Sequence, residues 1–149
     1  MSKFEEILVT LRDCIQKSEE FNNIDVYYDD SQMNSNCKLP AISFKVGTKT
    51  RTRQSVDCRE YERQIEIRLH TIELDKVKLQ SQLYDFEEQL IILIDDAKMS
   101  HEFNSFDIYE TKSSGIGALV YNARSEGKEY DKTFFSNILR VYFNVVYEF

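Results

Sequence analysis

The C-terminal stretch from Phe134 to Phe149 constrains the fold more than any other part of the chain, because apolar residues occur on both sides of its alternation. One side of a strand would carry Leu139, Val141, Phe143, Val145, Tyr147 and Phe149. The other side mixes Ile138, Tyr142 and Val146 with Arg140, Asn144 and Glu148. The first side requires a core, and the second requires another layer or another subunit. This stretch therefore favours a protein that assembles with copies or partners.

The composition favours one globular domain spanning residues 1–149. The chain is long enough to bury one core but short for two, and 42% of its residues are hydrophobic. No stretch approaches the roughly 20 apolar residues that span a bilayer, and the charged N-terminal residues exclude a signal peptide. A net charge of −7 has the wrong sign for gripping phosphate over a broad surface, although it leaves room for a local basic patch. An acidic surface would let DNA slide past without sticking.

The first half of the chain predicts a helix followed by strands. Apolar residues recur at helical spacing over residues 3–18, and Ser2 with Glu5 forms a capping-box start. A short strand is expected at residues 24–28, and a second strand begins at Pro40, where Ile42, Phe44 and Val46 alternate with polar residues. The polar residues 29–38 between them are typical of a surface loop.

Beyond Gly47 the alternation continues without an apolar side, because threonines alternate with Lys49, Arg51 and Arg53. This pattern predicts a long β-hairpin arm that extends past the body, with residues 59–72 as its returning strand. With the tip near Ser55 and Val56, Arg51 would lie opposite Glu60 and Lys49 opposite Glu62, so opposite charges would face each other across the ladder.

Residues 73–97 predict a second helix, in which seven apolar residues recur at three and four residues and Val77 and Ile91 widen the stripe. Strands are expected at residues 106–110 and 118–123, and residues 127–132 are expected to form a polar turn into the final strand. The predicted fold is α+β, with an antiparallel or mixed sheet of about five to six strands, two helices on one face and the long hairpin arm.

The chemical groups in the sequence do not predict an enzyme. The adjacent carboxylates at 29–30, 87–88 and 95–96 are expected to be solvated surface, and His70 and His101 lack the spacing of metal ligands. Cys14, Cys37 and Cys58 are odd in number and far apart, so we expect reduced thiols. No nucleotide-binding or hydrolase motif is present, and we expect neither a cofactor nor a metal.

The cationic side of the arm, Lys49, Arg51 and Arg53, has three interpretations. It forms a solvated hairpin tip, it contacts an acidic neighbouring subunit, or it contacts nucleic acid. Three charges are few for phosphate binding unless a symmetric assembly multiplies them.

The order of elements resembles the tail terminator (tail completion) proteins of long-tailed bacteriophages. The resemblance covers nearly the whole chain: the N-terminal helix, the strands and arm of residues 40–72, the helix of residues 74–97, and the run Asp131-Lys132-Thr133-Phe134-Phe135 leading into residues 139–143. It implies a virion protein, made in the host cytoplasm, that forms a ring, usually a hexamer, at the head-proximal end of the tail tube. Such a ring ends tube polymerisation, meets the head connector and in some tails the sheath, and leaves a central channel for DNA.

The residues expected at subunit interfaces are Lys49, Arg51, Arg53, Glu60, Glu62, Ile138, Tyr142 and Val146. Two other interpretations remain open: another neck or head-completion protein of a phage, and a cytoplasmic module that binds a peptide or small molecule with its sheet and arm. A monomer with one deep apolar pocket would favour the binding module.

Overall fold

The computed structural model describes residues 1–29, 38–54, 59–73, 75–114, 119–125 and 128–148. Its helices are α1 (Lys3–Lys17) and α2 (Lys76–Met99). Its strands are β1 (Asp25–Tyr27), β2 (Ala41–Gln54), β3 (Arg59–Glu73), β4 (Phe106–Ser114), β5 (Leu119–Ser125) and β6 (Lys128–Glu148). The α+β class and the predicted order of helix, three strands, helix, three strands are confirmed.

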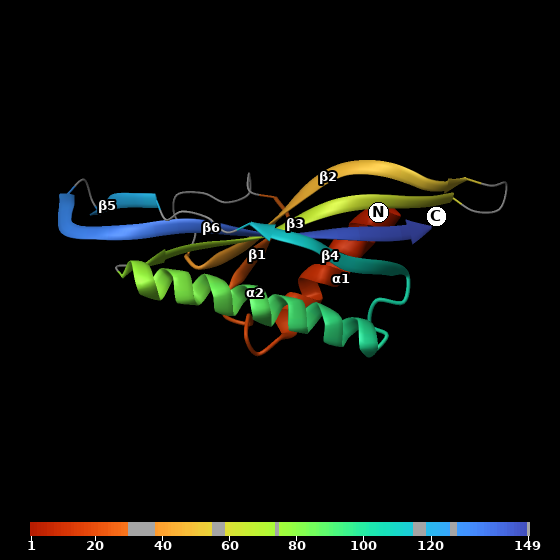
Figure 1. Ribbon diagram of the computed structural model, residues 1–149, viewed down its shortest axis with the longest axis horizontal. Coiled ribbons are helices and arrows are strands. Elements are labelled where there is room, and N and C mark those ends of the chain that lie inside the picture. The colour runs from red at the N-terminus through yellow and green to blue at the C-terminus, as the bar shows by residue number, and fades with distance from the viewer. Residues whose placement is uncertain (30–37, 55–58, 74, 115–118, 126–127, 149) are drawn as a thin grey trace.

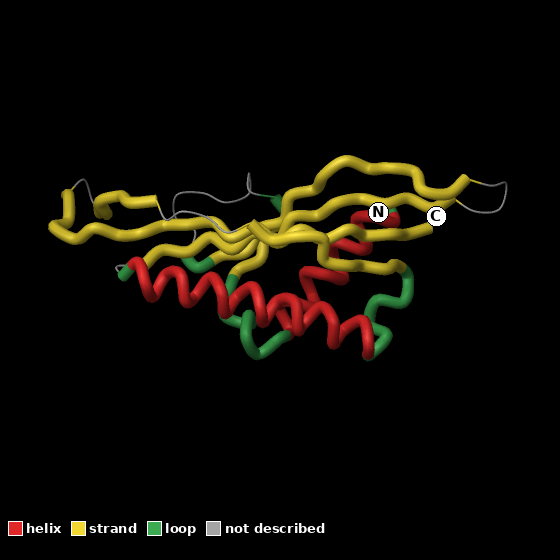
Figure 2. Tube along the Cα trace, in the orientation of Figure 1, coloured by secondary structure: helices red, strands yellow, loops and turns green. Residues whose placement is uncertain are grey.

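The strands form one mixed, six-stranded sheet with the order β1-β2-β3-β6-β4, and β5 pairs with the far part of β6. Of the strand pairs formed by the described residues, β1–β2 alone is parallel, and the others are antiparallel. Figure 1 shows the long strands running the length of the molecule, with β5 and the adjoining part of β6 reaching past the helices at one end. The two helices form a second layer against the sheet (Figure 2).

The core lies between the helices and one face of the sheet. Ile65 and Ile67 of β3 and Val141 and Phe143 of β6 are almost fully buried there, together with the apolar stripes of both helices. The stripe of α1 starts correctly because Ser2 and Glu5 form the predicted capping box, with the Glu5 amide donating to Ser2 Oγ at 3.1 Å.

Two predicted details of the last strand and the second helix differ from the structure. The last strand begins at Lys128, because polar residues predicted to form a turn pair instead with β5, from Leu119–Ser136 to Ser125–Lys128. Val77 does not join the core stripe of α2, since 74% of its surface is exposed. The exposure of Val77 shows that the core stripe of α2 is narrower at its start than the apolar pattern predicted.

The charge pairing predicted across the β2–β3 hairpin is wrong, although its register at the base of the hairpin is right. Val46 lies opposite Ile65, but a bulge then shifts the partners by one residue, so Lys49 lies opposite Arg63 and Arg51 opposite Tyr61. The bulge contains Gly47, where an added Cβ would lie 3.1 Å from the Gln64 carbonyl oxygen. That close approach suits glycine and marks the place where the alternation slips.

Candidate functional site

The hairpin predicted to be an arm is mostly part of the sheet. From Glu60 to Glu73, every residue of β3 pairs with β6, so the returning strand is flanked on both sides. Residues 55–58, where the tip was predicted, lie outside the described residues. Lys49 lies on the exposed part of β2, with its Nζ 4.4 Å from the centre of the Tyr61 ring. Therefore β2 is an edge strand of the sheet and not a free arm, and its cations Lys45 and Lys49 lie opposite Glu66 and Arg63 of β3.

This edge is free over most of its length in the described part of the chain. β1 pairs only with Ala41 to Ser43, and the rest of β2 pairs only with β3 on its inner side. β2 carries the cations Lys45, Lys49, Arg51 and Arg53 and no acidic residue. Lysines on an edge strand discourage random pairing, but they also present a cationic surface to a partner.

The sheet face opposite the helices, here called the helix-free face, holds the other predicted interface residues. Ile138, Tyr142 and Val146 of β6 are half-buried there. In register, Val146 lies between Glu62 of β3 and Asp107 of β4. The chain therefore covers this apolar strip only in part, so a second layer has room to pack on it.

A hydrogen-bonded cluster fixes one end of the helix-free face. The carboxylate of Glu62 accepts from Asn144 Nδ2 at 2.7 Å and from the hydroxyl of Tyr109. The bond to Glu62 raises the pKa of Tyr109, so that hydroxyl stays protonated as a donor. The structure thus brings the predicted Glu62 together with two residues on β4 and β6 that the sequence did not single out.

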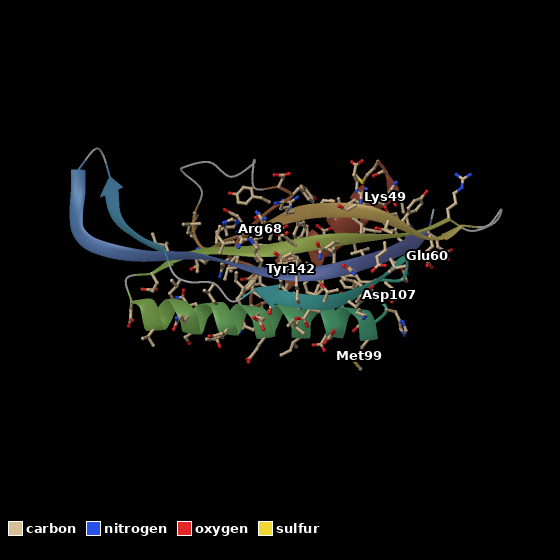
Figure 3. The ribbon with its side chains drawn as sticks, turned by 45° about the horizontal axis from the view of Figure 1, so that its top comes forward. Lys49, Glu60, Arg68, Met99, Asp107 and Tyr142 are labelled. Atoms are coloured by element: carbon tan, nitrogen blue, oxygen red, sulfur yellow. The ribbon has the colours of Figure 1, made fainter. Side chains whose placement is uncertain are left out.

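The middle of the helix-free face carries an ion pair and a cation–π contact. Arg68 donates from Nε and Nη2 to a single oxygen of Glu66, at 2.9 and 2.8 Å, and its side chain is nearly buried. Tyr142, which lies opposite Glu66, has the Lys112 ammonium 4.7 Å from its ring centre. Glu66 thus has Arg68 as its ion-pair partner and Tyr142 as its neighbour across the strands, and Figure 3 labels both Arg68 and Tyr142. These contacts hold Tyr142 in a defined position, with part of its surface still exposed.

The histidine, cysteine and carboxylate side chains of the described residues do not gather at one site. Among the described residues, no three His, Cys, Asp or Glu side chains come close enough to hold a metal ion. His70 hydrogen-bonds to Ser43 at 2.7 Å, while His101 lies in a left-handed turn (φ 59°) just after α2. Hollows lined by described residues have similar volumes, from 320 to 370 Å³. No helix in the described ranges is both long and apolar enough to cross a bilayer.

The thiol of Cys14 is half-buried beside Glu102, 3.9 Å from a carboxylate oxygen. Burial, reinforced by this carboxylate, raises the pKa of Cys14 to about 11. In a Cys37→Ser/Cys58→Ser variant at pH 7.5, we expect iodoacetamide to alkylate the folded protein about two orders of magnitude more slowly than the unfolded protein, because only the thiolate reacts. Equal rates in buffer and in guanidinium would contradict this environment for Cys14.

The same pKa shift makes stability depend on pH in a defined direction. The pKa of Cys14 in the folded protein lies above that of an unfolded thiol. The stability that the protonated thiol contributes is therefore fully present below about pH 8.5, and it is lost as the pH rises towards the pKa in the folded protein.

Comparison of the chain with models of known protein families and with curated proteins gave no match.

Proposed function

We propose that this chain is a virion structural protein, a tail terminator, whose copies close into a ring at the head-proximal end of a phage tail tube. The ring ends tube polymerisation and provides the joining surface for the head connector. Its partners are other copies of the chain, the tail tube protein, the neck proteins and, in a contractile tail, the sheath. DNA passes through the central channel without sequence-specific contacts.

The observation that carries this proposal is the edge strand β2, which pairs with β1 only at Ala41–Ser43 among the described residues and whose sequence has four cations and no acidic residue, on a protein whose net charge is −7. A positively charged edge on a negatively charged protein is complementary to a different, acidic part of a second copy. It is not complementary to the same edge of that copy. Contacts of this head-to-tail kind produce closed rings when the rotation between copies closes. The half-buried residues Ile138, Tyr142 and Val146 offer a further surface for such packing.

Native mass spectrometry and sedimentation of the purified protein, alone and mixed with tail tube subunits, test this proposal. We expect a closed ring of one defined mass in at least one of the two conditions. A strict monomer in both conditions would contradict the proposal.

Replacing Arg51 and Arg53 with glutamate should weaken assembly at least tenfold in subunit concentration while leaving the monomer folded. The reason is that the cationic edge then repels the acidic surface that it should meet. Sedimentation at several protein concentrations measures the shift, and circular dichroism checks the fold. Substitution of both residues by lysine is the matched control, and unchanged assembly of the glutamate variant would remove this edge from the interface.

A further inference from the structure

A hollow beside the start of α1 concentrates positive charge. It has a volume of about 320 Å³ and is lined by Ser2, Lys3, Phe4, Lys49, Arg63 and Tyr147. Among these described residues, three are cationic and none is acidic, although the whole chain carries 26 acidic and 19 basic side chains. A local excess of cations on an acidic protein indicates a site that attracts an anion.

Four elements of one chain build this hollow. Lys49 of β2 and Arg63 of β3 are direct partners across the two strands. The Arg63 guanidinium lies 4.5 Å from the ring centre of Phe4 in α1, and that ring lies 5.8 Å from the ring of Tyr147 in β6. Figure 1 shows the start of α1 and the end of β6 at the same end of the molecule. These ring contacts hold the cationic groups around one hollow.

Each of the three cations lies where a positive charge is unfavourable. Lys49 and Arg63 place like charges directly opposite each other in an antiparallel pair. Lys3 begins α1, where the helix dipole disfavours a cation. Arg63 is half-buried, and its Nε is buried without a hydrogen-bond acceptor among the described residues. The nearby Glu5 carboxylate accepts from the Ser2 amide at 3.3 Å and lines a different hollow. An anion in the hollow would relieve all three unfavourable placements.

We propose that this hollow binds a phosphate group that carries two negative charges. The count of cations favours phosphate, because one carboxylate would leave two of the three cations uncompensated. Arg63 offers paired N–H donors that match two phosphate oxygens, and the first amides of α1 add further donors. Burial raises the pKa of Tyr147, so its hydroxyl stays protonated as a donor. The site lies within one chain and does not rest on the proposed ring.

Equilibrium dialysis of the full chain against radiolabelled inorganic phosphate tests this site, at constant ionic strength and about pH 7.5, where a phosphate group carries close to two charges. We expect saturable binding of one phosphate per chain. Lys49→Gln and Arg63→Gln should each weaken binding at least tenfold. Arg63→Lys should weaken it less, because lysine keeps the charge but not the paired donors. Binding that does not saturate, or that is unchanged in both glutamine variants, would overturn the proposal.

The matched control is Lys45→Gln, which makes the same change on the same strand but opposite Glu66, on the helix-free face. It should leave phosphate binding unchanged, and thermal unfolding checks the folds of all variants. Competition with unlabelled compounds identifies the source of the phosphate group. Displacement by adenosine 5′-monophosphate would assign the site to phosphate monoesters, and displacement by inorganic phosphate alone would assign it to the free ion. Equally strong displacement by acetate would overturn the preference for phosphate.

Discussion

Replacing Phe143 with alanine should lower the free energy of unfolding by about 3–5 kcal/mol, because the ring fills the middle of the core and the surrounding side chains cannot close the cavity. Phe143 is 1% exposed and lies opposite Ile65 of β3, on a part of β6 that is flanked by β3 and β4. Urea unfolding followed by circular dichroism measures the change.

The matched control is Tyr84→Ala, which removes an aromatic ring that is 67% exposed. Its effect on monomer stability should stay within about 0.5 kcal/mol, since few contacts are lost. Equal losses for Phe143→Ala and Tyr84→Ala would contradict the arrangement of the core on one face of the sheet.

Replacing Val146 with arginine should weaken ring formation about a hundredfold while leaving the monomer folded. In the monomer, the guanidinium would lie between Glu62 and Asp107, the residues opposite Val146 in register. In the ring, the long side chain would occupy the space into which a partner packs, and overpacking costs about 1–3 kcal/mol. The concentration at half-assembly, measured by sedimentation, reports the change.

Asp13→Arg, on the exposed side of α1, is the control for adding an arginine and should leave assembly unchanged. If Val146→Arg assembled at the same concentration as the unmodified protein, the helix-free face around Val146 would not be an interface. The proposal would then depend on the β2 edge alone.

The sequence predicted those helices and strands in which apolar residues recur with a regular period. β3 and the second half of β6 alternate apolar and polar residues because one face of each lies under the helices, and the same burial produces the spacing of Leu83, Leu90 and Ile94 in α2. Residues 128–132 were predicted as a turn because most of them are polar, whereas the structure places them in β6, where Lys128 and Glu129 pair with β5. Backbone hydrogen bonds alone leave little trace in a sequence.

Of the predicted interface residues, the sequence indicated the burial of some but not the hydrogen-bond partners of others. The half-burial of Tyr142 and Val146 follows from their alternation, and the sequence indicated it. The partners of Glu62 were not predictable, because Tyr109 reaches it only through the pairing of β4 with β6. The charges across the hairpin were misassigned because a single bulged residue reverses the side on which each following residue lies.

β6 links the two ends of the molecule with one continuous backbone. It contains 21 residues and hydrogen-bonds in turn to β5, β4 and β3. An extended strand is already near its maximum length, about 3.3 Å per residue, so it resists stretching. A pull on the β5 end would thus be carried along the backbone of β6 to Glu148 with little lengthening of the strand.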